Sequence, residues 1–377
     1  MGAAFSNAIS SSLDWITGSE SAEKPKPLTP IQPEIKIVPL WDEKIGQGDG
    51  GKLLALTVAS AGGAVFAADH RGRVVALRLQ DGQRLFEVET GRPLAAGPAL
   101  GDGAVLLGTQ EGEVLALAQS SGKTLWTAQV SSEVLAPPAV DQGVVVVHSG
   151  DETVFAFSVT QGKLIWSFGQ HSVPLSLRGV SPPTILGNKV LIGFGGGRMA
   201  WLNLADGKVI WEKPLVGLTG TSELEQVVDI DSRPAVDDEA FYVTANYGGV
   251  IAAGLSEGDV LWRNERIVAH LNPAVASRRV FVTDSESHLW GLDKTTGRAY
   301  WKQTELRLRQ ATAPVPYGPW LVVGDYQGYV HFLAQEDGRI VGRHRVAKSP
   351  IRAEPQVAGD VLLVLASDGT LSALKIE

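Results

Sequence analysis

The stretch Leu204-Ala205-Asp206-Gly207-Lys208-Val209-Ile210-Trp211 decides the fold, because its pattern recurs along nearly the whole chain. In each copy a glycine follows a small or polar residue. The copy ends four residues after the glycine, usually in an aromatic residue. The glycines are Gly82, Gly122, Gly162, Gly207, Gly258, Gly297 and Gly338, and the end positions are Phe86, Trp126, Trp166, Trp211, Trp262, Trp301 and Gly342. The end positions are separated by 40, 40, 45, 51, 39 and 41 residues. A period near 40 residues with four strand-like runs is typical of a β-propeller.

The third repeat shows the four runs of one period. Pro138 to Val140 opens a short strand, Val144 to Val147 is a β-branched run, Val154 to Phe157 is a third strand, and Leu164 to Trp166 is a fourth. Small polar residues and glycines separate these runs, which is the hairpin signal, because glycine reaches positive φ without steric cost. Four such strands form one blade. A single blade cannot bury both of its apolar faces, so the blades are expected to stack.

Proline gives a second register that agrees with the first. Prolines that fit the first residue of a strand, where no ladder N–H is needed, are spaced by 40, 45, 51, 39, 41 and 41 residues. They are Pro98, Pro138, Pro183, Pro234, Pro273, Pro314 and Pro355. After the seventh repeat the chain continues through two more apolar runs and stops where an eighth outer strand is due. Residues 36–41 fit that missing strand.

The sequence therefore predicts an all-β fold: an eight-bladed β-propeller of four-stranded antiparallel blades. An N-terminal outer strand is expected to close the ring and thereby remove open sheet edges. Residues 1–34, which include four closely spaced prolines, are predicted to form a flexible tether, and residues 35–377 the propeller. The net charge of −8 and the lack of any long basic run exclude a general nucleic-acid binder. No apolar stretch approaches the ~20 residues that span a bilayer.

The candidate catalytic and metal motifs have structural explanations. Gly254-Leu255-Ser256-Glu257-Gly258 matches the G-x-S-x-G nucleophile elbow, but its last glycine is the hairpin glycine of the repeat. The elbow also needs a strand that leads into a helix. The glycine-rich runs at 46–51 and 193–197 are interpreted as turns, and the periodic tryptophans as packing between blades. No histidines lie two or four residues apart, and there is no cysteine, so spacing indicates no metal site. We expect no catalytic residue, no cofactor and no metal.

Two stretches lengthen the repeat. The intervals of 45 and 51 residues place extra residues between blades three and four and between blades four and five. These extra residues fall at 172–179 and at 218–231. The connections from an outer strand to the next inner strand all emerge on one face of a propeller, so the two loops are expected to be neighbours.

The two loops supply the candidate site residues. We expect Leu175, Leu177 and Arg178 of the first loop to lie close to Asp229 and Asp231 of the second. Apolar residues on extended loops, flanked by an arginine and carboxylates, favour a protein-binding patch. Two alternatives stay open: the charges only pin the loops to each other, or the Asp-x-Asp pair binds a metal.

The repeat resembles that of quinoproteins, whose hallmark is a Gly-Lys-x-x-Trp ending, present here at Gly122, Gly162 and Gly207. Three segments are more narrowly similar to the BamB family, the propeller lipoproteins of the outer-membrane β-barrel assembly machine in Gram-negative bacteria. These are residues 175–179, residues 221–224 together with 229–231, and residues 322–329. The resemblance covers about residues 35–377.

The resemblance implies a non-enzymatic, monomeric scaffold at the periplasmic face of the outer membrane. It implies binding to the POTRA domains of BamA, with unfolded outer-membrane protein clients as further partners. The family's BamA-contacting positions match Leu175, Leu177, Arg178, Asp229 and Asp231. Membrane contact is expected only through a lipid anchor. The family's lipidated cysteine and signal peptide are missing from this sequence, and we expect it to begin just after that cysteine.

Two other functions stay open. One is a quinone-dependent dehydrogenase with the same number of blades, although those enzymes carry a paired-cysteine and calcium apparatus and this chain has no cysteine. The other is a generic propeller hub that binds a different partner.

Overall fold

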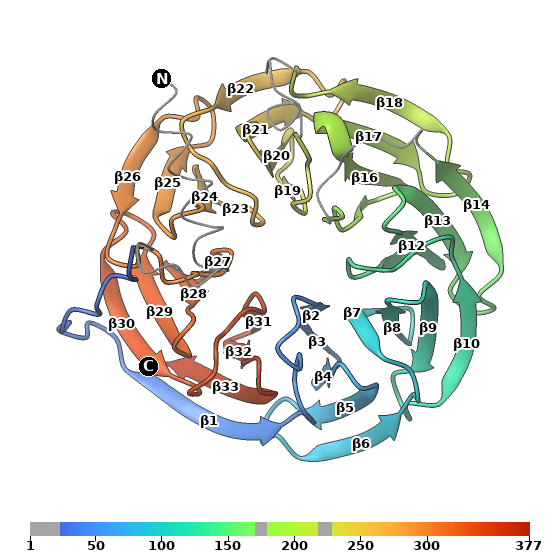
Figure 1. Cartoon of the computed structure of the whole chain (residues 1–377), viewed down its shortest axis with the longest axis horizontal. Helices are drawn as coiled ribbons and strands as arrows, with labels where there is room; N and C mark the ends of the chain where they lie inside the picture. Colours follow the sequence, from blue (N-terminus) through green and yellow to red (C-terminus); the bar gives the residue numbers. More distant parts are fainter. Residues whose placement is uncertain (1–22, 170–178, 218–227) are drawn as a thin grey trace.

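The computed structural model describes residues 23–169, 179–217 and 228–377. Eight β-sheets follow one another around a central axis and form a closed ring (Figure 1). Seven sheets have four strands, and the sheet of blade 2 has a fifth, β2 (Ala55–Leu56), which pairs in parallel with β7. The one helical element in these ranges is a 3-10 turn, η1 (Gly195–Gly197). Within the same ranges no helix could span a membrane. The predicted eight-bladed propeller is confirmed.

The strands are named in chain order. Blade 1 contains β3 (Val58–Ala61), β4 (Ala64–Ala68), β5 (Arg73–Arg78) and β6 (Arg84–Glu89). Blade 2 contains β7 (Leu94–Gly101), β8 (Ala104–Thr109), β9 (Glu113–Ala118) and β10 (Thr124–Gln129). Blade 3 contains β11 (Ala139–Asp141), β12 (Val144–His148), β13 (Thr153–Ser158) and β14 (Leu164–Gly169). Blade 4 contains β15 (Thr184–Leu186), β16 (Lys189–Phe194), β17 (Arg198–Asn203) and β18 (Val209–Pro214).

The second half of the ring repeats this arrangement. Blade 5 contains β19 (Ala235–Val236), β20 (Ala240–Ala245), β21 (Gly249–Gly254) and β22 (Val260–Asn264). Blade 6 contains β23 (Ala274–Ala276), β24 (Arg279–Thr283), β25 (Leu289–Asp293) and β26 (Ala299–Gln303). Blade 7 contains β27 (Val315–Tyr317), β28 (Trp320–Gly324), β29 (Tyr329–Ala334) and β30 (Ile340–Arg345). Blade 8 contains β31 (Gln356–Ala358), β32 (Val361–Leu365), β33 (Thr370–Ile376) and β1 (Ile37–Lys44).

The strand order gives the ring two distinct faces. In each blade the first strand lies next to the axis, the fourth lies on the rim, and neighbouring blade strands are antiparallel (Figure 1). The turn between the second and third strands therefore lies on the same face as the connection to the next blade. We call this the loop face. The opposite face carries the first and third turns of each blade, and we call it the hairpin face.

Blade 8 closes the ring with strands from both ends of the chain. β1 pairs antiparallel with β33, from Ile37 opposite Ile376 to Lys44 opposite Thr370. The outer strand predicted at residues 36–41 is thus confirmed, and it extends three residues further. Because β1 supplies the fourth strand, blade 8 exposes no unpaired outer edge of β33 to solvent.

The periodic tryptophans join each blade to the next, as predicted. Trp211 of β18 is 7 % exposed, and its indole Nε1 donates to the carbonyl O of Leu255 in blade 5 at 3.1 Å. Its ring lies on Gly258, the glycine of the next hairpin, where an added Cβ would be 2.9 Å from the ring. Gly258 has φ +72°, so this position requires glycine both for its backbone and for the close approach of the indole.

The same contact recurs around the ring. Trp41, Trp126, Trp166, Trp262 and Trp301 donate to a carbonyl of the next blade at 2.6–3.1 Å. Each ring lies on the hairpin glycine of that blade; the glycines are Gly82, Gly162, Gly207, Gly297 and Gly338. Phe86 packs on Gly122 in the same way but has no indole N–H to donate.

Blade 7 departs from this pattern, because Gly342 occupies the place of the tryptophan. The space above Gly342 holds the side chains of Ile35 and Ile37, and a Cβ added to this glycine would lie 2.8 Å from the first and 3.2 Å from the second. Both isoleucines pack against the apolar cluster shared by blades 7 and 8. The segment that leads into β1 thus fills the gap in the tryptophan series.

Residues 23–34, the described part of the predicted tether, contain no strand and lie against blades 6 and 7. Leu28 packs on the apolar cluster that includes Leu306 and Trp301. The amide of Glu34 donates to the carbonyl of Val341 in β30 at 2.8 Å. We call residues 23–35 the strap. The boundary between tether and propeller stays a prediction.

We expect Trp211→Ala to lower the free energy of unfolding by about 3–5 kcal/mol, because it deletes a large buried aromatic side chain and leaves a cavity. Denaturant unfolding measures this change. Leu261→Ala is the control. Leu261 lies on the outer strand of blade 5, directly before Trp262, but it is 60 % exposed. A loss below about 1 kcal/mol for Trp211→Ala would show that this contact does not hold the blades together.

Candidate functional site

The stems of the two long connections lie side by side on the loop face, as the sequence predicts. Asp231 lies so close to the end of the first connection that a Cβ on Gly179 would be 2.0 Å from its Oδ2. The hydroxyl of Ser181 donates to the carbonyl O of Ser232 at 2.9 Å. Glycine at position 179 therefore allows the β14–β15 connection to approach the β18–β19 connection.

Asp229 is built into the base of the second connection. Its side chain is 2 % exposed, and its Oδ1 accepts a hydrogen bond from the amide of Gly196 at 3.1 Å. Its carbonyl accepts from the amide of Asn246 at 3.1 Å. Ile230, the next residue, is fully buried in the core between blades 4 and 5. Asp229 thus ties its connection to turns of both blades.

Glu152 completes an acidic cluster with the two aspartates. It lies in the β12–β13 turn of blade 3, with φ +62°, and its Oε1 accepts from the amide of Gly195 at 2.7 Å. Burial raises the pKa of Glu152, and the charge of Asp229 adds to this rise. Burial, followed by the charges of Asp229 and Glu152, raises the pKa of Asp231 to about 7. Near neutral pH, Asp231 is therefore present in both its protonated and its ionised form.

A neutral histidine binds the first connection beside the acidic cluster. His148 is 2 % exposed, and burial lowers its pKa to about 4. Its Nδ1 lies 3.0 Å from the carbonyl O of Ser181, so Nδ1–H donates to the first connection. The ring packs edge-on against Phe194, with 5.1 Å between ring centres. Blade 3 and blade 4 together thus form a fixed base for the two connections.

Tyr247 presents an aromatic side chain on the same face. It lies in the β20–β21 turn with φ +56° and is 38 % exposed. The neighbouring Gly248 fits against Val216 and Val228, the two ends of the second connection. A bulky residue at positive φ is strained, and such strain occurs often at functional sites.

Of the five predicted site residues, the structure describes Asp229 and Asp231, which lie two residues apart at the base of the second connection. Leu175, Leu177 and Arg178 lie outside the described residues. Among the residues that are described, no group of histidine and acidic side chains has a geometry that could hold a metal ion. The third segment of the resemblance, residues 322–329, lies apart from this cluster, on blade 7.

Sequence reasoning missed Glu152 and Tyr247. Both lie in short turns between the second and third strands of a blade, and such turns have no regular sequence pattern in this chain. Neither belongs to the repeat, and neither is near the two connections along the chain. No signal in the sequence links them to the site.

Eight blades, six of which are joined to the next by a tryptophan on a hairpin glycine, define a propeller of the quinoprotein-like class. A family model described as "Outer membrane protein assembly factor BamB" matches residues 70–303 and 304–377. A relative of the same description in Alkalilimnicola ehrlichii is 51 % identical over 337 residues, which are 89 % of this chain and 88 % of the relative. Another, in Pseudomonas aeruginosa, is 40 % identical over 96 % of this chain and 95 % of the relative. The chain belongs to the BamB family.

Solved structures agree on the fold. BamB from Moraxella catarrhalis superposes with a TM-score of 0.81 at 22 % identity, covering 90 % of this chain and all of that one. Quinohemoprotein alcohol dehydrogenase from Comamonas testosteroni superposes with a TM-score of 0.72 at 12 % identity, covering 90 % of this chain and 76 % of that one. At these identities, both likenesses show the propeller fold alone.

We expect Asp231→Asn to stabilise the protein at about pH 8, by roughly 1–3 kcal/mol. The pKa of Asp231 is higher in the folded state than in the unfolded state, so folding is favoured while this carboxyl is protonated. This contribution to stability is complete below the unfolded value near 4, and it is lost as the pH rises to about 7. Asparagine cannot ionise, so the variant avoids this loss, and the two proteins should have equal stability near pH 4. Denaturant unfolding at both pH values measures the difference.

Asp206→Asn is the matched control for this experiment. Asp206 is exposed and paired with Lys208, so its replacement should change stability little. If Asp231→Asn destabilised the protein at pH 8, Asp231 would be held as a favourable charge, contrary to the burial described here.

Proposed function

We propose that this chain is a non-enzymatic scaffold subunit of the outer-membrane β-barrel assembly machine. It would act at the periplasmic face of the outer membrane, anchored by lipid, and bind the POTRA domains of BamA. Membership of the BamB family supports this proposal, since the relatives are described as outer membrane protein assembly factors. Unfolded outer-membrane proteins are its further clients in this proposal.

The contact surface that we propose is the loop face of blades 3 to 5. The observation that carries it is the joining of the two long connections there, through Gly179 against Asp231 and Ser181 against Ser232. These are the two places where the repeat is lengthened, and blade packing does not need the additional residues. Loops that a rigid scaffold holds in place commonly carry binding residues.

The five predicted residues take different roles in this proposal. Leu175 and Leu177 supply apolar anchors, and Arg178 and Asp231 supply charges that orient the partner. Asp229 is buried and bonded to the amide of Gly196, so we assign it a positioning role within the second connection.

Tyr247 extends the proposed surface. Its turn is fixed to the second connection through the bond from Asn246 N to Asp229 O, and its ring is partly exposed. An aromatic side chain on a rigid turn offers a large contact area at little cost in conformational entropy, and tyrosine is enriched among binding hot spots. We therefore include it as a third anchor.

The dehydrogenase alternative has weaker support. It depends on a likeness to quinohemoprotein alcohol dehydrogenases at 12 % identity, which extends only to the fold. The relatives that are similar in sequence over most of their length are described as assembly factors.

We expect the double variant Leu175→Ala/Leu177→Ala to bind the BamA POTRA segment at least tenfold more weakly, which is about 1.4 kcal/mol. Truncating apolar anchors of this size typically costs more than about 1 kcal/mol each. Isothermal titration calorimetry with the purified POTRA segment measures the affinity, and a thermal unfolding curve of each variant checks the fold.

Leu85→Ala is the control, because Leu85 lies on the outer strand of blade 1 and is 51 % exposed. It should bind like the wild type. A folded double-leucine variant that retains wild-type affinity would move the contact surface to another part of the ring.

A further inference from the structure

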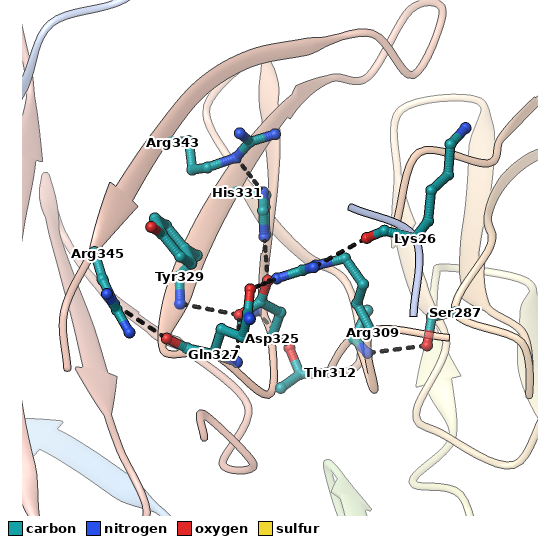
Figure 2. A network of polar contacts seen from close by, with 12 residues as sticks. Lys26, Ser287, Arg309, Thr312, Asp325, Gln327, Tyr329, His331, Arg343 and Arg345 are labelled. Carbon is teal, nitrogen blue, oxygen red and sulfur yellow. Dashed lines mark hydrogen bonds and ion pairs between the residues drawn. The ribbon is translucent and has the colours of Figure 1, made fainter. Parts of the chain in front are cut away.

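A buried polar network lies beneath the strap on blade 7. Figure 2 shows it centred on Asp325, which follows β28 and is fully buried. Arg309, 2 % exposed, donates to Asp325 Oδ2 from Nε at 2.9 Å and from Nη2 at 2.7 Å. The other carboxylate oxygen accepts from the amides of Gln327 and Tyr329 at 2.8 Å and 3.0 Å. Asp325 is thus ionised and fully bonded.

His331 fits this network in one protonation state. The ring is fully buried, with Nε2 2.9 Å from Asp325 Oδ2 and Nδ1 3.1 Å from Nε of Arg343. The Arg343 Nε–H can only donate, so Nδ1 must be the acceptor and the proton must be on Nε2. A second proton, on Nδ1, would point at the Arg343 N–H. Protonation of His331 therefore removes this contact.

The two arginines that flank His331 also hold the strap. Arg309 Nη1 donates to the carbonyl of Lys26 at 3.0 Å, and Arg343 Nη1 donates to the carbonyl of Thr29 at 3.1 Å. Figure 2 shows Lys26 beside the Arg309 guanidinium, with Arg343 on the opposite side of His331. The strap therefore depends on Arg343, which contacts His331, and on Arg309, which shares the Asp325 carboxylate with His331.

The other contacts of the strap are two backbone hydrogen bonds, from the amide of Lys26 to the carbonyl of Arg307 at 3.0 Å and from the amide of Glu34 to the carbonyl of Val341 at 2.8 Å, together with ion pairs and apolar contacts. Glu23 pairs with Arg307, Lys26 with Glu305 at 2.7 Å, and Glu34 with Arg339 at 2.9 Å, all partly exposed to solvent. Exposed ion pairs of this kind contribute little to stability. The apolar contacts are Leu28 and the isoleucines above Gly342.

We propose that the strap is a proton-sensitive latch: it lies closed on blade 7 while His331 is neutral, and it detaches when His331 takes up a second proton. Protonation drives Arg343 away from the imidazole and so withdraws its bond to Thr29. Detachment lifts Ile35 from the notch above Gly342, which no tryptophan fills. It also frees Lys26 from the β26–β27 connection, which lies on the loop face.

The charges around His331 set the direction of this response. Asp325 faces it from the β28–β29 turn, Arg343 from β30 and Arg309 from the β26–β27 connection, and the Tyr329 ring lies 6.2 Å away on β29. Burial lowers the pKa of His331; Asp325 opposes this, and Arg343 and Arg309 add to it. The closed latch therefore binds the proton less well than the detached one. It is most stable above the ordinary histidine pKa near 6.5, and it weakens as the pH falls below that value.

Thiol labelling can follow the latch, because the chain has no cysteine of its own. Ile35→Cys places one thiol in the notch, and Leu53→Cys places one at a site that is 89 % exposed, as the reference. The ratio of the two labelling rates with a maleimide cancels the effect of pH on the reagent and the part of thiol ionisation that the two sites share. At about pH 8 we expect Ile35→Cys to react at least tenfold more slowly than the reference. At about pH 5 we expect this protection to fall at least fivefold.

Variants of His331 and Arg343 distinguish detachment of the strap through His331 from other effects of low pH on the protein. His331→Gln keeps one donor and one acceptor but cannot be protonated in this range, so protection should no longer change with pH. Arg343→Gln should show weak protection at both pH values, and it tests the mechanism even if the glutamine variant does not fold. His70→Gln is the control, since His70 lies in the β4–β5 turn of blade 1, outside the strap and its network, and should leave the pH response intact.

Leu28→Cys serves as a second reporter on the strap. The inference is wrong if wild-type protection is the same at both pH values, or if its loss at low pH persists in His331→Gln. It is also wrong if neither Ile35→Cys nor Leu28→Cys is protected at about pH 8.

Discussion

The contact between a tryptophan and the hairpin glycine of the next blade is the constraint on which the ring depends. Each indole covers a glycine whose φ is positive and whose missing Cβ leaves room for the ring. Its N–H then bonds to a carbonyl of the same hairpin. The contact fixes both the distance and the rotation between neighbouring blades. The four-stranded antiparallel blades that it holds together have all their blade-to-blade connections on one face, so loop length is free to vary there.

The site on that face differs from the rest of the ring because it is not arranged for stability. Glu152, Asp229 and Asp231 lie close together, so neighbouring charge adds to burial in raising the pKa of Glu152 and of Asp231. Glu152 and Tyr247 also hold positive φ values. A partly buried acidic cluster and strained turns lower stability, and natural proteins retain such features where function requires them. We therefore propose the loop face of blades 3 to 5 as the functional surface, and we interpret the tryptophan contacts as the scaffold that supports it.

The periodic part of the structure could be predicted from the sequence, and the rest could not. The glycine and tryptophan spacing predicts the number of blades, and the apolar run at residues 36–41 predicts the closing strand. The closeness of the segments around Gly179 and Asp231 could be predicted, because the repeat intervals showed which two connections are long. Glu152 and Tyr247 could not, because their turns come from other parts of the chain and only folding brings them close. The replacement of a tryptophan by Ile35 and Ile37 was equally hidden: Gly342 marks the gap, but nothing in the sequence shows which residues fill it.

The central claim is that the loop face of blades 3 to 5 contacts the POTRA domains of BamA, and site-specific photo-crosslinking tests it most directly. A benzophenone side chain at position 247 would report on the loop face, and one at position 257, in the exposed third turn of the same blade, on the hairpin face. Our account predicts a covalent product with the POTRA segment from Tyr247→benzoylphenylalanine and none from Glu257→benzoylphenylalanine. A product from position 257 alone, or equal products from both positions, would contradict it.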